Sequence, residues 1–112
     1  MLKTKQRLRH DRDFIQVFKK GKRHSLGGVL LYYKTNNLHN TRIGFVVSKK
    51  YSPLAVKRNR QRRILQHALE KLYPKIIPGH DIIISYTNRD KVLPYRDAVS
   101  ILETILHKIK LI

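Results

Sequence analysis

The charge distribution of this sequence limits both the folds and the partners open to it. Between Asp13 and Glu70 there is no acidic residue, whereas 13 Lys and Arg fall in the same stretch. Over all 112 residues, 25 Lys and Arg face 7 Asp and Glu, which gives a formal net charge of +18. A folded domain with this charge is destabilised by self-repulsion unless a polyanion neutralises it. The chain is therefore predicted to bind a polyanionic partner.

Nucleic acids and anionic membranes are the polyanions available in a cell. A membrane-surface helix needs a basic face opposite a broad apolar face, and no segment here has basic residues flanking an exposed aromatic stripe. The longest apolar run, 29–33, is far shorter than the roughly 18 residues of a membrane span. The N-terminus also lacks the apolar core of a secretory signal. The sequence therefore predicts a cytoplasmic protein that binds nucleic acid and no membrane.

The first 21 residues are predicted to form an arm and a helix. Residues 1–9 are polar and basic with little to bury, so a flexible basic arm is expected. Asp11 is placed to cap the helix that follows, Asp13 lies in its first turn, and Gly21 ends it. The apolar residues of this helix recur at helical spacing: Phe14, Val17 and Phe18.

Two segments have the β-branched and aromatic composition of strands, 28–34 and 42–48. The turn-forming residues 35–41 between them predict an antiparallel hairpin. A short extra strand is expected at 22–27.

The second half of the chain predicts a helix, a buried strand and another helix. Ser52 is expected to be the N-cap, with Pro53 at the first helical position and the helix running to Leu72. Its apolar stripe covers only the C-terminal half: Leu65, Ala68, Leu69 and Leu72. A buried strand follows at 81–86 and an amphipathic helix at 94–110.

These elements predict one α+β domain over residues 1–112, in the order α-β-β-β-α-β-α. Helices packed on a sheet make a two-layer sandwich. No internal repeat, low-complexity tract or linker divides the chain.

The densest basic feature is the N-terminal half of the helix that Ser52 opens. Arg58 and Arg62 form one i, i+4 row, and Asn59 and Arg63 form the adjacent row. A solvated helix face would alternate acids with cations, but this half of the helix contains no Asp or Glu. Arginine forks suit phosphate oxygens, and asparagine can bond a base edge or a sugar hydroxyl. The residues predicted to bind nucleic acid are Lys57, Arg58, Asn59, Arg60, Arg62 and Arg63.

The residue types present argue against catalysis by the protein itself. Cysteine is absent, and the six His residues have no metal-ligand spacing. No carboxylate cluster exists for two-metal hydrolysis. His-Asp pairs occur at 10–11 and 80–81, but adjacent residues rarely face each other, and capping or turn formation explains both acids. We therefore predict no catalytic residue and no metal site.

Three segments resemble the protein subunit of bacterial ribonuclease P. They are RIGFVVSKK at 42–50, AVKRNRQRR at 55–63 and DFIQVFKKG at 13–21. The resemblance implies a small basic subunit that binds a large catalytic RNA and contacts the 5′ leader of precursor tRNA, which the holoenzyme removes. It implies that Mg²⁺ belongs to the RNA-containing holoenzyme and that no protein partner is required. It also implies a mixed four-stranded sheet with a left-handed crossover.

Carried over residue by residue, the resemblance assigns two surfaces. The basic helix residues named above match the family's helix that faces the RNA subunit. Five residues match the family's cleft for the leader: Phe14, Phe18, Tyr32, Lys49 and Lys50. The sequence departs from the family at Gln66, where another Arg is frequent, and at 51–54, where a glycine-containing connection is frequent.

Other functions remain to be weighed against this one. The main alternative is a general RNA-binding module, such as a small ribosomal protein or an RNA chaperone. A DNA-binding regulator would need a second helix just before the basic one, where a strand is predicted instead. A protein-only nuclease would need a catalytic constellation that the sequence lacks.

Overall fold

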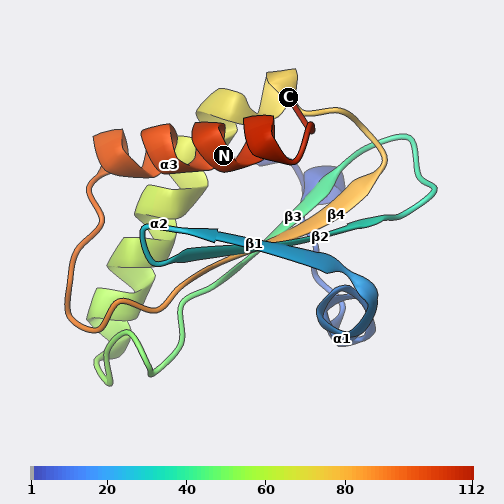
Figure 1. Ribbon diagram of the computed structural model, residues 1–112. Coiled ribbons are helices and arrows are strands. Elements are labelled where there is room, and N and C mark those ends of the chain that lie inside the picture. Colours follow the sequence, from blue (N-terminus) through green and yellow to red (C-terminus); the bar gives the residue numbers. More distant parts are fainter. Residues whose placement is uncertain (1) are drawn as a thin grey trace.

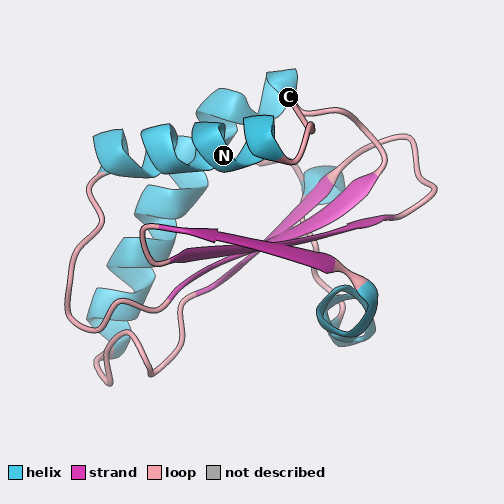
Figure 2. Ribbon diagram, in the orientation of Figure 1, coloured by secondary structure: helices cyan, strands magenta, loops and turns pink. Residues whose placement is uncertain are grey.

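The computed structural model describes residues 2–112 and contains a four-stranded sheet with helices on both of its faces (Figures 1 and 2). The predicted α+β class, the element order and the short extra strand near 22–27 are confirmed. The elements are η1 (Thr4–Gln6), α1 (Asp11–Lys20), β1 (Lys22–Leu26), β2 (Val29–Thr35), β3 (Arg42–Val46), α2 (Ala55–Leu72), η2 (Tyr73–Lys75), β4 (His80–Tyr86) and α3 (Tyr95–Lys108).

Strand β4 is apolar on both faces and takes a central place in the sheet. Its residues Ile82, Ile83 and Ile84 are fully buried, as expected for a strand covered on both sides. The strand order is β1-β2-β4-β3, with β3 and β4 parallel and the other pairs antiparallel. The predicted hairpin of 28–34 with 42–48 is therefore wrong, because β4 lies between these two strands.

The helices divide unequally between the two faces of the sheet. Helices α2 and α3 cover one face and enclose the main core, which includes Leu31, Leu65 and Leu102. Helix α1 lies against the other face, where Val17 packs with Ile83 in a smaller cluster. Helix α1 thus adds a partial third layer to the expected two-layer sandwich. Helix α2 connects the parallel strands β3 and β4, and the left-handed sense of this crossover stays a prediction.

Two helix starts differ from the sequence-based prediction. His10 is the N-cap of α1, so Asp11 is its first residue and does not cap it. Helix α2 begins at Ala55 with Leu54 as its N-cap. The Ser52 hydroxyl accepts a hydrogen bond from the Leu54 amide, at 3.1 Å. The Ser52 hydroxyl therefore stabilises the turn before the helix and does not cap it, and Pro53 lies in that turn.

The N-terminal segment has more to bury than the sequence suggested. Leu2 and Leu8 are both buried, and the Leu8 amide donates to the Ile43 carbonyl at 2.9 Å. Arg7 forms a parallel bridge with Ile43. Residues 2–9 therefore lie along the outer edge of β3, and the description of 1–9 as an arm with little to bury is wrong for these residues. Met1 lies outside the described residues.

Gly21 joins α1 to β1 at a point where no side chain fits. A β-carbon at this position would lie 2.5 Å from the Val17 carbonyl oxygen and 2.9 Å from that of Tyr33. Its backbone is extended, with φ −77°, so close approach and not a left-handed conformation requires the glycine.

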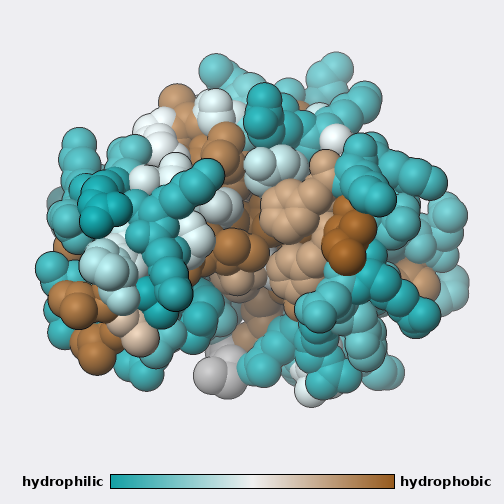
Figure 3. Space-filling model, turned by 90° about the horizontal axis from the view of Figure 1, so that it is seen from below, coloured by the Kyte–Doolittle hydropathy of each residue, from teal (hydrophilic) through white to brown (hydrophobic). Residues whose placement is uncertain are grey.

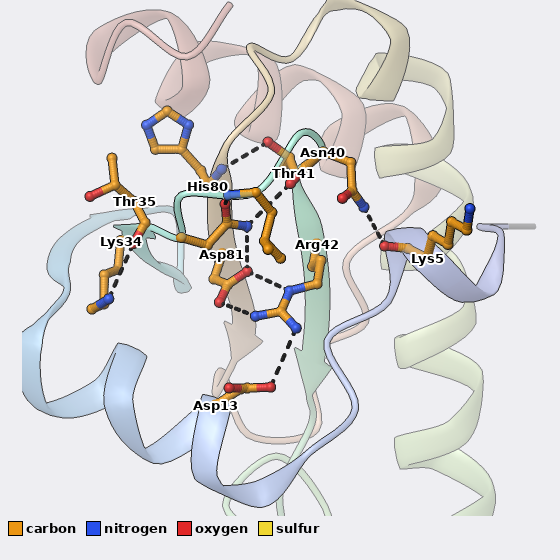
Figure 4. A network of polar contacts seen from close by, with 11 residues as sticks. Lys5, Asp13, Lys34, Thr35, Asn40, Thr41, Arg42, His80 and Asp81 are labelled. Carbon is orange, nitrogen blue, oxygen red and sulfur yellow. Dashed lines mark hydrogen bonds and ion pairs between the residues drawn. The ribbon is translucent and has the colours of Figure 1, made fainter.

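An ion-pair network fixes α1 to the sheet (Figure 4). Arg42 donates from Nε and Nη2 to both carboxylate oxygens of Asp81, at 2.8 and 2.7 Å. Its Nη1 reaches Asp13 in the first turn of α1, at 3.4 Å. These hydrogen bonds to Asp81 raise the pKa of Arg42 above its ordinary value. The turn role inferred for Asp81 is therefore wrong, since its carboxylate pairs with Arg42.

Replacing Arg42 with Ala is expected to lower the free energy of unfolding by about 2 kcal/mol, because it leaves the buried Asp81 carboxylate without its bidentate partner. Urea unfolding at neutral pH measures this change. Arg89→Ala is the control, since Arg89 is exposed and its contact with Asp90 spans 4.0 Å. Equal losses in the two variants would contradict the anchoring role of Arg42.

Candidate nucleic-acid interface

The N-terminal half of α2 presents its cations on the surface. Lys57, Arg60 and Arg63 are exposed, and the other three predicted residues, Arg58, Asn59 and Arg62, are half-buried. Within residues 2–112, none of the five Lys and Arg between 57 and 63 makes an ion pair with Asp or Glu. Their charge is therefore available to a partner.

Gln61 lies within this basic run, yet it is only 1% exposed. Its Oε1 accepts hydrogen bonds from the Leu93 amide at 2.9 Å and from the Tyr51 hydroxyl at 3.3 Å. Its Nε2 donates to the Leu93 carbonyl at 3.1 Å. Burial raises the pKa of Tyr51, which keeps its hydroxyl proton available for this bond. Gln61 thus ties the basic half of α2 to the segments on either side of it.

Sequence reasoning missed Gln61 because it stands among cations. Its position was nevertheless visible in the helical periodicity. Counting back from the apolar stripe, Gln61 precedes Leu65 by four residues and Leu69 by eight, so it faces the core. Only a fully hydrogen-bonded amide is tolerated in such a place.

Two of the predicted RNA-binding side chains also have local roles. Arg58 donates from Nη1 to the carbonyls of Ser52 and Pro53, at 3.0 and 2.9 Å. Arg62 donates to the Asn59 Oδ1 at 2.9 Å. Arg58 therefore holds the turn before α2, and Asn59 and Arg62 orient each other. Arg60 and Arg63 make no such contact within the described chain.

The aromatic residues gather on the α1 side of the sheet. Phe18 of α1 meets Tyr32 of β2 edge to face, with ring centroids 4.8 Å apart. Phe18 is 45% exposed and Tyr32 is half-buried. Phe14 lies over Gly44 of β3, where a β-carbon would come within 2.6 Å of the Phe14 ring. These rings thus pack on the sheet and at the same time leave part of their surface exposed to solvent.

Strand register explains this arrangement. Tyr32, Ile83 and Gly44 form one row across β2, β4 and β3. Phe18, Val17 and Phe14 of α1 lie above these three positions. On β1 the row continues with Arg23, which pairs with Tyr32 and is exposed. Sequence analysis missed Arg23 as a cation beside the aromatic surface.

Figure 3 views the molecule from below, the side on which α1 lies. Apolar surface lies in a hollow there, between two blocks of hydrophilic side chains. Lys49 and Lys50 are exposed in the turn that follows β3. The structure therefore brings Phe18 and Tyr32 into contact, and it places Lys49 and Lys50 in the connection that leads to α2.

A pocket of about 360 Å³ joins the basic helix to the aromatic side. It lies at the outer edge of β3, between the N-terminal segment and α2. Arg62 and Phe14, which the sequence assigned to different surfaces, both line it. Arg7 and Arg9 also line it, and they were not among the predicted site residues.

Within residues 2–112, no group of three or more His, Asp or Glu side chains is placed to hold a metal ion. Asp13 and Asp81 are both engaged by Arg42. No helix in the described part of the chain is long and apolar enough to span a membrane. The exposed groups of the site are thus cations and aromatic rings, which bind phosphates and bases.

Comparison with known proteins gives consistent results. The family model described as Ribonuclease P matches residues 2–110. The ribonuclease P protein component of Pseudanabaena sp. is 37% identical over all of this chain and 97% of its own length. That of Alkaliphilus metalliredigens is 32% identical over 99% of both chains.

Solved structures agree with this result. The RNase P protein of Staphylococcus aureus superimposes with a TM-score of 0.82 at 26% identity, over 95% of this chain and 96% of its own. That of Thermotoga maritima gives 0.78 at 26% identity, over 91% and 96%.

The Gln61 contacts predict that Gln61→Ala lowers the free energy of unfolding by about 2–3 kcal/mol, because the Leu93 amide and carbonyl lose their partners in a buried place. Thermal and urea unfolding measure the loss. Gln16→Ala is the matched control, since Gln16 is exposed on α1. An unchanged stability of Gln61→Ala would show that the amide does not hold α2.

Proposed function

Because this chain belongs to the ribonuclease P protein family, we propose that its α2 surface binds the catalytic RNA and that its α1-side hollow binds the 5′ leader of the substrate. The function of the chain is that of the family: it is the protein subunit of the ribonucleoprotein that removes the 5′ leader from precursor tRNA. It is an accessory subunit of an endoribonuclease.

The observation that carries the α2 assignment is the run of cations without acidic partners. Lys57, Arg60 and Arg63 are exposed on a helix that the buried Gln61 ties to Leu93. Folded RNA presents closely spaced phosphates, and neutralising them releases condensed counterions. A rigid row of guanidinium groups is suited to such a surface.

The leader assignment is supported by exposed rings beside cations. A single strand offers unstacked bases, which stack on aromatic faces, and a phosphate backbone, which follows basic grooves. Phe18 and Tyr32 supply the rings, and Arg23 lies beside them on β1. Lys49 and Lys50 would extend the basic side toward α2. Phe14, which lies over Gly44, would border the hollow at β3.

The proposal assigns the chemistry of phosphodiester cleavage to the RNA subunit and its Mg²⁺. The exposed cations of α2 and the rings on the α1 side support a protein contribution of binding and orienting RNA. We further propose that the assembly works in the cytoplasm, where bacterial precursor tRNA arises, without a second protein.

Replacing Arg60 and Arg63 together with Ala is expected to weaken binding to the RNA subunit at least about tenfold at moderate salt. If each contacts one phosphate, the slope of log affinity against log salt concentration falls by about 1.5. Filter binding across a salt series measures both effects. These two residues are chosen because Arg58 and Arg62 also support local structure.

The control for this experiment removes the same charge from another surface. Arg96→Ala with Lys108→Ala changes two exposed cations on α3. If this variant loses as much affinity as the α2 variant, net charge and not the α2 surface governs binding.

Phe18→Ala is expected to weaken binding of leader-bearing precursor tRNA by about tenfold, the range of one lost base–aromatic stack. Leaderless tRNA should bind as before, since it offers no single strand to this face. Titration of the reconstituted holoenzyme with each RNA measures the difference. Ile15→Ala is the control, because Ile15 is also about half exposed on α1, at 49%. An equal loss for both RNAs would mean that the Phe18 ring only stabilises the fold.

A further inference from the structure

The pocket at the outer edge of β3 shares Arg62 with the α2 surface and Phe14 with the α1-side hollow, and its other features point to a ligand site. Its volume of about 360 Å³ lies in the range of small-molecule sites. One wall is the N-terminal segment, another is α2, and Phe14 of α1 forms a third. Ile43, Gly44 and Phe45 of β3 also line it.

The edge of β3 offers free backbone groups to this pocket. The Ile43 carbonyl accepts from the Leu8 amide, so it points away from β4. Peptide groups alternate in direction along a strand, and the amide and carbonyl of Phe45 therefore also point outward. Among the described residues, only Arg7 bridges this edge, at Ile43. Phe45 thus presents one donor and one acceptor to the pocket.

The charge of the residues that line the pocket also differs between its two ends. Arg62, Gln66 and Glu70 line it as one i, i+4 row of α2. Because β3 and β4 are parallel, the crossover helix α2 runs opposite to β3, which brings Arg62 to the Phe45 end. Residues 7–9 run parallel to β3 and bring Arg9 to the same end. Cations therefore gather at one end, whereas Glu70, which has a contact of its own, marks the other.

We propose that this pocket binds one unstacked nucleotide of an RNA strand. The phosphate lies between Arg9 and Arg62, the base lies against Phe14, and its edge meets the Phe45 backbone and the Gln66 amide. Aromatic contact, an amide and an exposed strand edge are suited to a base, and paired guanidinium groups to a phosphate. The inference rests on the proposed function, since it places this nucleotide where the α2 surface and the α1-side hollow meet.

The first test is an NMR titration of the full-length protein with adenosine monophosphate, ribose 5-phosphate and inorganic phosphate. We expect saturable shifts of the Gly44 and Phe45 amides with the nucleotide only. Gln66→Trp fills the pocket without changing charge, and its steric clash with a bound nucleotide should weaken binding, read from these shifts, at least about tenfold. His67→Trp, on the exposed side of the same helix, should leave them unchanged. Equal shifts with inorganic phosphate would reduce the pocket to an anion site and overturn the proposal.

The second test identifies the source of the nucleotide. Gln66→Trp is compared with His67→Trp in binding to the RNA subunit alone and, as holoenzyme, to precursor tRNA with and without a leader. A selective loss with the RNA subunit assigns the nucleotide to that RNA, and a leader-dependent loss assigns it to the substrate. No selective loss in any arm overturns the proposal. Failure of the wild-type protein to bind either RNA would instead overturn the proposed function, and the nucleotide titration remains interpretable in that case.

Discussion

The burial of β4 on both faces determines how the rest of this molecule is arranged. A strand with three consecutive fully buried isoleucines must lie inside the sheet and be covered on both sides. Its central place separates β2 from β3 and makes β3 the parallel edge strand. A parallel connection needs a long crossover, and α2 supplies it. The helix that carries the cations is therefore also the helix that the sheet requires.

Two of the few acidic residues form structural ion pairs away from the cations of 57–63. Asp13 and Asp81 are both engaged by Arg42, which ties α1 to the sheet. The other described ion pairs, at Lys75 and Arg89, lie outside the 57–63 run. An acid paired with the cations of 57–63 would stabilise the free protein, but it would compete with phosphates for the same cations. The separation of structural pairs from unpaired cations is consistent with a protein whose charge is neutralised by RNA.

Local signals in the sequence predicted most elements, and long-range pairing explains the main error. The apolar period of 65–72 and the isoleucines of 81–86 were enough to predict a helix and a buried strand. Neighbouring strands in the chain favour a hairpin, and only the double-sided burial of β4 argues against it. The Arg42 network was missed because its main partner, Asp81, is 39 residues away in the chain. The burial of Gln61 was visible in the helical period, but its partner Leu93, 32 residues away, was not. The basic and aromatic site residues themselves were visible in the sequence, whereas the edge pocket required the fold.

The rigidity of α2 gives a physical reason for its unusual composition. Five cations between residues 57 and 63 repel one another, at a cost of a few tenths of a kcal/mol for each close pair. A flexible helix end would relieve this repulsion by fraying. Here Gln61 fixes one side to Leu93, and Arg58 closes the preceding turn onto Ser52. The helix backbone that carries the cations is thus fixed in the free protein, so binding of RNA to this surface, as proposed, would cost less conformational entropy. In the proposed complex, phosphates lying between the arginines would offset the repulsion that destabilises the free protein.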